Sequence, residues 1–127
     1  MNDDGIIYYY AKGARPYRRV FRELEKYTDL NFEPTRRYNK AEIVCSYDDI
    51  NYAAGVARRV GDQFHVITDP DYKRVNRTYH VESHEVGHAL GLGHDPGYTS
   101  AMTSRWDDIP KFFTDQDYSV INALDWM

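Results

Sequence analysis

Three histidines at fixed spacing constrain the fold of this chain more than any other feature. The segment from His84 to His94 fits the pattern H-E-x-x-H-x-x-G-x-x-H at every fixed position. A shuffled chain of this composition would contain the full pattern in about one case in 10⁴–10⁵, so chance does not explain it. Residues four apart share one face of an α-helix, and the pattern therefore predicts a helix that carries His84 and His88 side by side. Gly91 tolerates the left-handed conformation that ends a helix, which lets His94 return toward the pair.

These residue types at this spacing predict a zinc site. Three neutral imidazoles favour Zn²⁺ and leave a fourth position to water, whereas a structural zinc would need a fourth protein ligand. Glu85 is rotated about 100° around the helix from His84, so we expect it beside the metal. There it is suited to take a proton from the attacking water and to return it to a leaving amine. His80 lies four residues before His84 and is predicted to line the pocket or cap the helix rather than to bind metal.

Length and composition place this site in one globular domain. The chain has 127 residues, a formal net charge of -4 and a hydrophobic fraction of 42%. A chain of this size buries a sufficient core without a disulfide or an oligomer, so we predict a monomer. The acidic balance gives no general attraction to nucleic acid, and no apolar run approaches the ~20 residues of a membrane span. No export signal is visible, which leaves the compartment open, and Cys45 is predicted to be a buried strand residue.

The hydrophobic pattern predicts an α+β fold. Strands are expected at 6–10, 31–34, 41–47, 53–57 and 64–67, and helices at about 14–30, about 76–90 and from Thr114 onward. The apolar positions of the first helix are Tyr17, Val20, Phe21, Leu24 and Tyr27, and those of the last helix are Tyr118, Val120, Ile121 and Leu124. Thr114 and Asp117 resemble a capping box. Arg15, Arg18, Arg19 and Arg22 form a basic cluster, for which a solvated helix face is favoured over an anion site.

The extended histidine motif, followed closely by a methionine, resembles the metzincin clan of zinc endopeptidases. Met102 stands where the clan carries its Met-turn methionine, and the resemblance implies a hydrophobic floor beneath the metal. Matrixins, the catalytic domains of matrix metalloproteinases, match best along much of the chain. The likeness implies a mixed, twisted β-sheet of four to five strands with three helices. It also implies one catalytic domain over 1–127, with a zinc cleft between a larger N-terminal subdomain (about 1–93) and a small C-terminal subdomain (about 94–127).

The same likeness implies roles for residues around the cleft. Asp117 would brace the Met-turn by hydrogen bonds. Ala54, Gly55 and Val56 would lie in an edge strand at the upper rim, where unpaired backbone groups can bind an extended peptide. Asp95 replaces the usual matrixin serine and is expected to anchor the turn rather than to bind metal. Arg105, Trp106, Asp107 and Pro110 would form the wall of the pocket beyond the scissile bond.

Departures from the matrixin pattern limit the metals that we expect. The segment between Tyr47 and Phe64 is shorter than the matrixin loop that holds a structural zinc and calcium, and only His65 has a counterpart among the histidines of that site. We therefore predict one catalytic zinc and no structural zinc or calcium. Ser104 stands where astacins and serralysins have a tyrosine ligand, so that ligand should be absent.

Three functions fit these residues. The first is a zinc-dependent endopeptidase that hydrolyses a peptide or protein substrate, with no nucleic-acid or membrane partner. The second is a zinc-containing peptide-binding module that has lost turnover, which the intact Glu85 disfavours. The third is a hydrolase that uses the same metal on another carbonyl.

Overall fold

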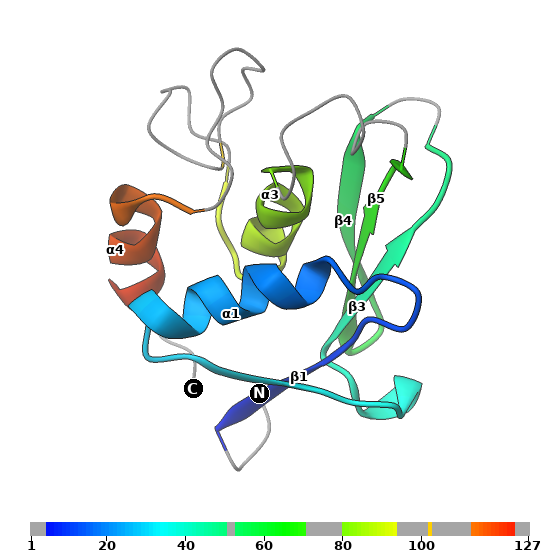
Figure 1. Ribbon diagram of the computed structural model, residues 1–127, viewed down its shortest axis with the longest axis horizontal. Coiled ribbons are helices and arrows are strands. Elements are labelled where there is room, and N and C mark those ends of the chain that lie inside the picture. The colour runs from blue at the N-terminus through cyan, green and yellow to red at the C-terminus, as the bar shows by residue number, and fades with distance from the viewer. Residues whose placement is uncertain (1–4, 51–52, 71–79, 94–101, 103–112, 124–127) are drawn as a thin grey trace.

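The computed structural model describes residues 5–50, 53–70, 80–93, 102 and 113–123, which form an α+β fold (Figure 1). The strands are β1 (Ile6–Tyr10), β2 (Asn31–Pro34), β3 (Ile43–Tyr47), β4 (Gly55–Val60) and β5 (Gln63–Thr68). The α-helices are α1 (Tyr17–Tyr27), α3 (His80–Ala89) and α4 (Asp115–Ala123), and a 3-10 turn, η1, covers Tyr38–Lys40. The predicted mixed sheet and its accompanying helices are thus confirmed.

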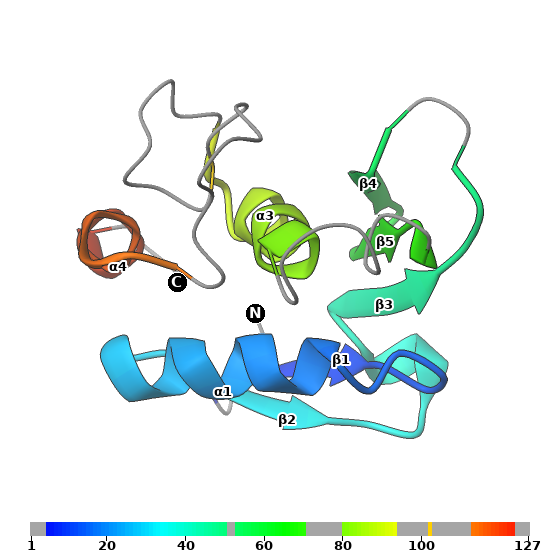
Figure 2. The same cartoon turned by 45° about the horizontal axis from the view of Figure 1, so that its top comes forward.

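The five strands form one sheet in the order β2-β1-β3-β5-β4. Neighbouring strands from β2 to β5 run parallel, and β4 runs antiparallel to β5. A tight turn joins β4 to β5, and Gly61 adopts a positive φ of 62° in it, as such turns require. Figure 2 shows the sheet twisting from β2 to β4 around α1 and α3. Among the described strands, β4 therefore forms an edge.

Aromatic packing joins α1 to the first strands. Tyr17, Val20, Phe21 and Leu24 are the buried residues of α1. The Phe21 ring stacks on Tyr9 of β1 with the centroids 4.1 Å apart, and it lies 4.9 Å from the ring of Phe32 in β2. These contacts hold α1 across the two parallel strands that it connects, as in other β-α-β units.

The first and last helices differ from their predicted extents and faces. Helix α1 begins at Tyr17 rather than at residue 14, because the Ala14 N–H donates to Ala11 O in a preceding turn. It ends at Tyr27, where the Thr28 hydroxyl donates to Leu24 O at 2.6 Å. Two of the apolar positions named for these helices are not buried, since 54% of Tyr27 and 46% of Val120 are exposed, and Leu124 lies outside the described residues. Apolar spacing identifies a helix face but not how far the partner elements extend over it.

Three strands also differ in extent. Strand β3 starts at Ile43 rather than at residue 41. Strand β4 spans Gly55–Val60 and β5 spans Gln63–Thr68, since the turn at Gly61 aligns the end of β4, Val60, with the start of β5, Gln63. The prediction for Cys45 is confirmed: it is buried in β3, where burial raises the pKa of its thiol.

No helix in the described part of the chain combines the length and the hydrophobicity that crossing a bilayer requires.

Candidate metal centre

His84 and His88 lie one turn apart on α3 with their Nε2 atoms 3.2 Å from each other. Their ring planes are at 83° to each other, and the centroids are 4.8 Å apart. Two nitrogens bound to one tetrahedral zinc at about 2.0–2.1 Å lie about 3.3 Å apart. The observed spacing therefore fits two ligands of one ion.

A helix-ending turn orients the second of these rings. Gly91 adopts a φ of 97°, its N–H donates to His88 O at 3.0 Å, and the Leu92 N–H donates to Gly87 O at 2.9 Å. This is the Schellman arrangement, which turns the chain back along the helix. The turn brings Leu92 O within 2.8 Å of His88 Nδ1, which donates its proton there. A neutral His88 then presents the lone pair of Nε2, as metal-binding histidines do.

The predicted third ligand, His94, lies outside the described residues. Within those residues, no group of three His, Cys, Asp or Glu side chains is arranged to hold a metal. Asp95 and Trp106 also lie outside the described residues, as do Arg105, Asp107 and Pro110. His80 is the first residue of α3, and its side chain is not among those described.

Glu85 lies between the two histidines in sequence and has 6% of its surface exposed. Burial raises the pKa of its carboxyl group to about 7. A Cβ built on Gly55 of β4 would lie 2.8 Å from Cγ and 2.8 Å from Oε2 of Glu85. The edge strand and the carboxylate are therefore in direct contact, and Gly55 is the residue that permits it. The neighbouring rim residues differ in exposure: Ala54 is buried and Val56 is half-buried.

Met102 packs against α3 at Gly87, which lies between His84 and His88 in sequence. It has 2% of its surface exposed, and its Sδ lies where a Cβ on Gly87 would be. The Phe113 ring also reaches this position, with Cε1 3.3 Å from the same built Cβ. A glycine at position 87 is thus what lets the methionine approach the helix backbone.

Asp117 is buried in the first turn of α4. Its Oδ2 accepts hydrogen bonds from the Thr114 N–H at 2.9 Å and from the Thr114 hydroxyl at 3.2 Å. The bond from the Thr114 N–H is one of the two reciprocal bonds of a capping box. The part of the Met-turn that Asp117 was expected to brace lies outside the described residues, apart from Met102 itself.

Sequence reasoning missed two buried polar contacts near α3. Glu82 has 1% of its surface exposed and accepts a hydrogen bond from the Tyr47 hydroxyl at 2.7 Å. Tyr17 of α1 and Thr68 of β5 share a hydrogen bond of 2.5 Å between their hydroxyl groups. Glu82 is rotated about 200° from His84 around the helix, so it could have been predicted to face the sheet. The Tyr47–Glu82 bond ties α3, which carries His84 and His88, to β3.

His65, the one counterpart of a second-zinc histidine, lies on β5. Its Nε2 is 3.3 Å from the Tyr38 hydroxyl and 3.3 Å from Gln63 Oε1. Burial, and to a smaller extent the Arg58 charge, lowers its pKa. The proton on this imidazole therefore leaves more readily than from an exposed histidine.

Comparison with known proteins finds similarity in fold and not in sequence. No family model and no curated protein sequence matches the chain. The crystal structure of archaemetzincin from Methanopyrus kandleri superposes with a TM-score of 0.52 and 15% identity, over 91% of this chain and 92% of that one. A zinc-dependent peptidase from Methanocorpusculum labreanum superposes with a TM-score of 0.54 and 13% identity, over 93% of this chain and 100% of that one. The chain therefore has a metzincin-like fold.

Proposed function

We propose that this chain is a zinc-dependent endopeptidase that cleaves peptide bonds with Glu85 as general base and then general acid. The observation that carries the proposal is the pair of Nε2 atoms 3.2 Å apart on α3, with Glu85 on the same helix. The fold shared with archaemetzincin and with a zinc-dependent peptidase supports both the metal and the substrate class.

His84, His88 and His94 are the proposed ligands of one catalytic zinc, and we propose no structural zinc or calcium. Zinc bound there would polarise the substrate carbonyl and lower the pKa of a bound water. The His88–Leu92 hydrogen bond supports this assignment, because it holds the imidazole in the tautomer that ligation needs.

Glu85 is proposed to move the proton. Its carboxylate accepts a proton from the attacking water and passes it to the leaving amine, so one group serves both halves of the reaction. Its burial favours this role, because a carboxylate shielded from solvent exchanges protons with the bound reactants rather than with bulk water. The contact with Gly55 limits the positions that the carboxylate can take.

Strand β4 is the proposed binding site for the peptide. It forms the edge of the described sheet and contacts Glu85 through Gly55. An extended peptide that pairs with residues 54–56 would add a strand beside the carboxylate, a common mode of peptide recognition. Residues 105–110 are proposed for the opposite wall, in a cleft between the subdomains at about 1–93 and 94–127.

We also propose roles for three residues on the basis of the resemblance to matrixins. Met102 would support the histidines from below, Asp95 would anchor the turn after His94, and Asp117 would brace the Met-turn. The burial of Met102 against Gly87 favours the first of these roles. We propose that the active form is a monomer, which size-exclusion chromatography with light scattering would test.

A peptide-library assay tests the function. We expect the zinc-loaded chain to cleave internal peptide bonds, a chelator to abolish cleavage, and added Zn²⁺ to restore it. Glu85→Gln should bind zinc equally but lose at least about 10²-fold in kcat, since a general base contributes about 10²–10⁴-fold. Zinc at one per chain with peptide affinity but no hydrolysis would instead indicate a binding module and overturn the proposal.

A further inference from the structure

A pocket lies at the carboxyl ends of β1 and β2, the two strands farthest from β4 in the sheet. It has a volume of about 590 Å³ and is lined by residues 10–13, residues 34–36, Arg15 and Arg18. The lining comes from two segments: residues 10–18, which run from the end of β1 into α1, and residues 34–36 at the end of β2. The volume lies within the range of sites that bind small organic molecules, about 300–1,000 Å³.

The topology explains why these segments meet. Strands β1 and β2 are parallel, with Tyr9 aligned to Pro34, and the Thr35 N–H donates to Tyr9 O at 2.8 Å. The chain therefore leaves both strands at the same edge of the sheet, as Figure 2 shows. The segments that follow β1 and β2 therefore lie side by side at the carboxyl ends of these two strands.

The lining of this pocket is strongly basic. Lys12, Arg15, Arg18 and Arg36 all line it, and none of the described lining residues is acidic. This concentration of positive charge occurs on a chain with a formal net charge of -4. An anion would therefore be attracted to this pocket rather than to the surface at large.

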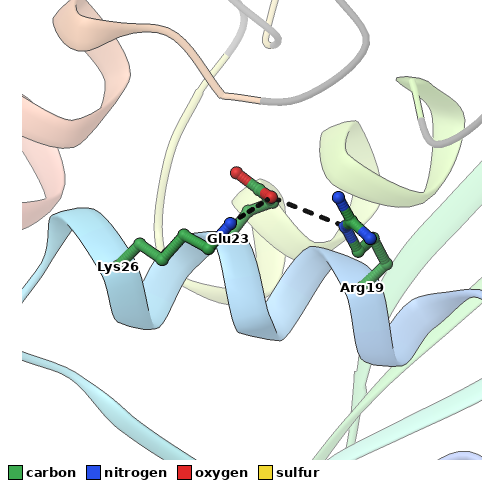
Figure 3. Close-up of polar contacts among 3 residues, drawn as sticks. All are labelled: Arg19, Glu23 and Lys26. Carbon is green, nitrogen blue, oxygen red and sulfur yellow. Dashed lines mark hydrogen bonds and ion pairs between the residues drawn. The ribbon is translucent and has the colours of Figure 1, made fainter.

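The structure also divides the basic cluster of α1 into two groups. Arg15 and Arg18 line the pocket. Glu23 instead pairs with Arg19 at 3.5 Å and with Lys26 at 3.2 Å, farther along the helix (Figure 3). Arg15, Arg19 and Arg22 are exposed, as a solvated helix face requires, and Arg18 is half-buried.

We infer that this pocket binds the phosphate group of a small phosphorylated molecule. Guanidinium groups match phosphate oxygens with paired hydrogen bonds, and three arginines are present. The N–H groups of Tyr17, Arg18 and Arg19 already bond to carbonyl groups of residues 14–16, so the proposed contacts are the arginine side chains and not these helix N–H groups. The positive end of the α1 dipole adds a smaller attraction. The pocket exceeds the size of a phosphate ion, which leaves room for an organic part.

Calorimetric titration of the zinc-loaded full chain tests this inference. The probes are inorganic phosphate, glucose 6-phosphate and glucose, with glucuronate as a carboxylate of similar size. We expect inorganic phosphate and glucose 6-phosphate to bind, and glucose and glucuronate to bind at least about tenfold more weakly. Tighter binding of glucose 6-phosphate than of inorganic phosphate would show that the organic part contributes. Equal affinity for glucuronate and glucose 6-phosphate would overturn the phosphate assignment.

Three arginine variants locate the binding. Arg18→Gln and Arg36→Gln should each weaken phosphate binding at least about tenfold, the scale of a lost charge-assisted hydrogen bond. Arg19→Gln removes the same charge from the next position on α1 and should change affinity less than about twofold. An equal loss of phosphate affinity in all three variants would indicate binding to diffuse surface charge. No loss of affinity in any variant would place the anion elsewhere, such as at the metal. Either result overturns the inference. Circular dichroism and zinc content control for folding, and Arg36→Gln keeps the test open if Arg18→Gln does not fold.

Discussion

Gly55 of β4 and Glu85 of α3 approach so closely that no side chain fits between them. A Cβ at position 55 would lie 2.8 Å from Glu85 Oε2 and 2.8 Å from Val81 Cγ1. Contacts between carbon and other heavy atoms are normally about 3.5 Å or longer. The contact therefore couples the position of the proposed catalytic carboxylate to the strand proposed to hold the peptide.

Gly55→Ala should lower kcat without removing the metal. The added methyl group forces the Glu85 carboxylate or β4 to shift, and a displacement of about 1 Å can cost about 10²-fold in rate. Steady-state peptide cleavage and zinc stoichiometry measure the two effects separately. Gly93→Ala is the matched control, because a Cβ there meets nothing within 4 Å. A Gly55→Ala protein with wild-type kcat would contradict the proposed position of the carboxylate during catalysis.

Gly91→Ala should destabilise the turn that orients His88. A Cβ at this position meets no atom within 4 Å, so the cost comes from the positive φ of 97°. We expect the free energy of unfolding to fall by about 1–2 kcal/mol, and by less in Gly91→Asn, because asparagine tolerates this conformation better. Urea denaturation measures the loss. Zinc affinity should fall in parallel, since Leu92 O would no longer be held against His88 Nδ1, and an unchanged affinity would count against that role.

Gly87→Ala should destabilise the chain although alanine favours helices. Helix propensity alone would raise the free energy of unfolding by about 1 kcal/mol, whereas overpacking against the Met102 sulfur lowers it by about 1–3 kcal/mol. We expect a net loss in thermal denaturation. The double variant Gly87→Ala/Met102→Ala should lose less than the sum of the two single variants, because the new methyl group occupies part of the vacated space. Additive losses would show that the two residues do not share that space.

The free energy of unfolding should decrease as pH rises above about 9. Burial holds the pKa of the Cys45 thiol well above its ordinary value of 9.0, so the folded state keeps the proton that the unfolded state releases. The protonated thiol thus makes its full contribution to the free energy of unfolding below pH 9.0, and this contribution is lost as the pH rises toward the folded-state pKa. Cys45→Ala should flatten this dependence by about 1.4 kcal/mol per pH unit, measured by urea denaturation from pH 7 to 10.5. A thiol reagent should react with Cys45 only after unfolding.

The helix that carries His84 and His88 and its end at Gly91 could be predicted because both follow from local rules. Ligand spacing requires a helix, and glycine is the residue that most readily leaves one. Strands such as β1 followed from short runs of β-branched and aromatic residues, whereas residues 53–57 were predicted to be extended from a run of small residues. The start of α1 was wrong by three residues, because the turn at Ala14 depends on a hydrogen bond to Ala11 O that helical spacing does not reveal.

Contacts between distant segments could not be predicted from spacing. Gly55 reaches Glu85 only because β5 lies between β3 and β4 in the sheet, which places β4 beside α3. The edge position of β4 was expected from family resemblance alone. The basic pocket was missed for the same reason: Arg36 is far from Arg15 in sequence, and only the parallel pairing of β1 with β2 brings them together.

The most direct test of the proposed zinc site is a crystal structure of the zinc-loaded chain with anomalous data at the zinc absorption edge. We predict one strong peak at about 2.0–2.1 Å from Nε2 of His84 and of His88, with His94 as third protein ligand and water at the remaining position. A peak coordinated through His88 Nδ1, a fourth protein ligand in place of water, or zinc bound away from α3 would contradict it.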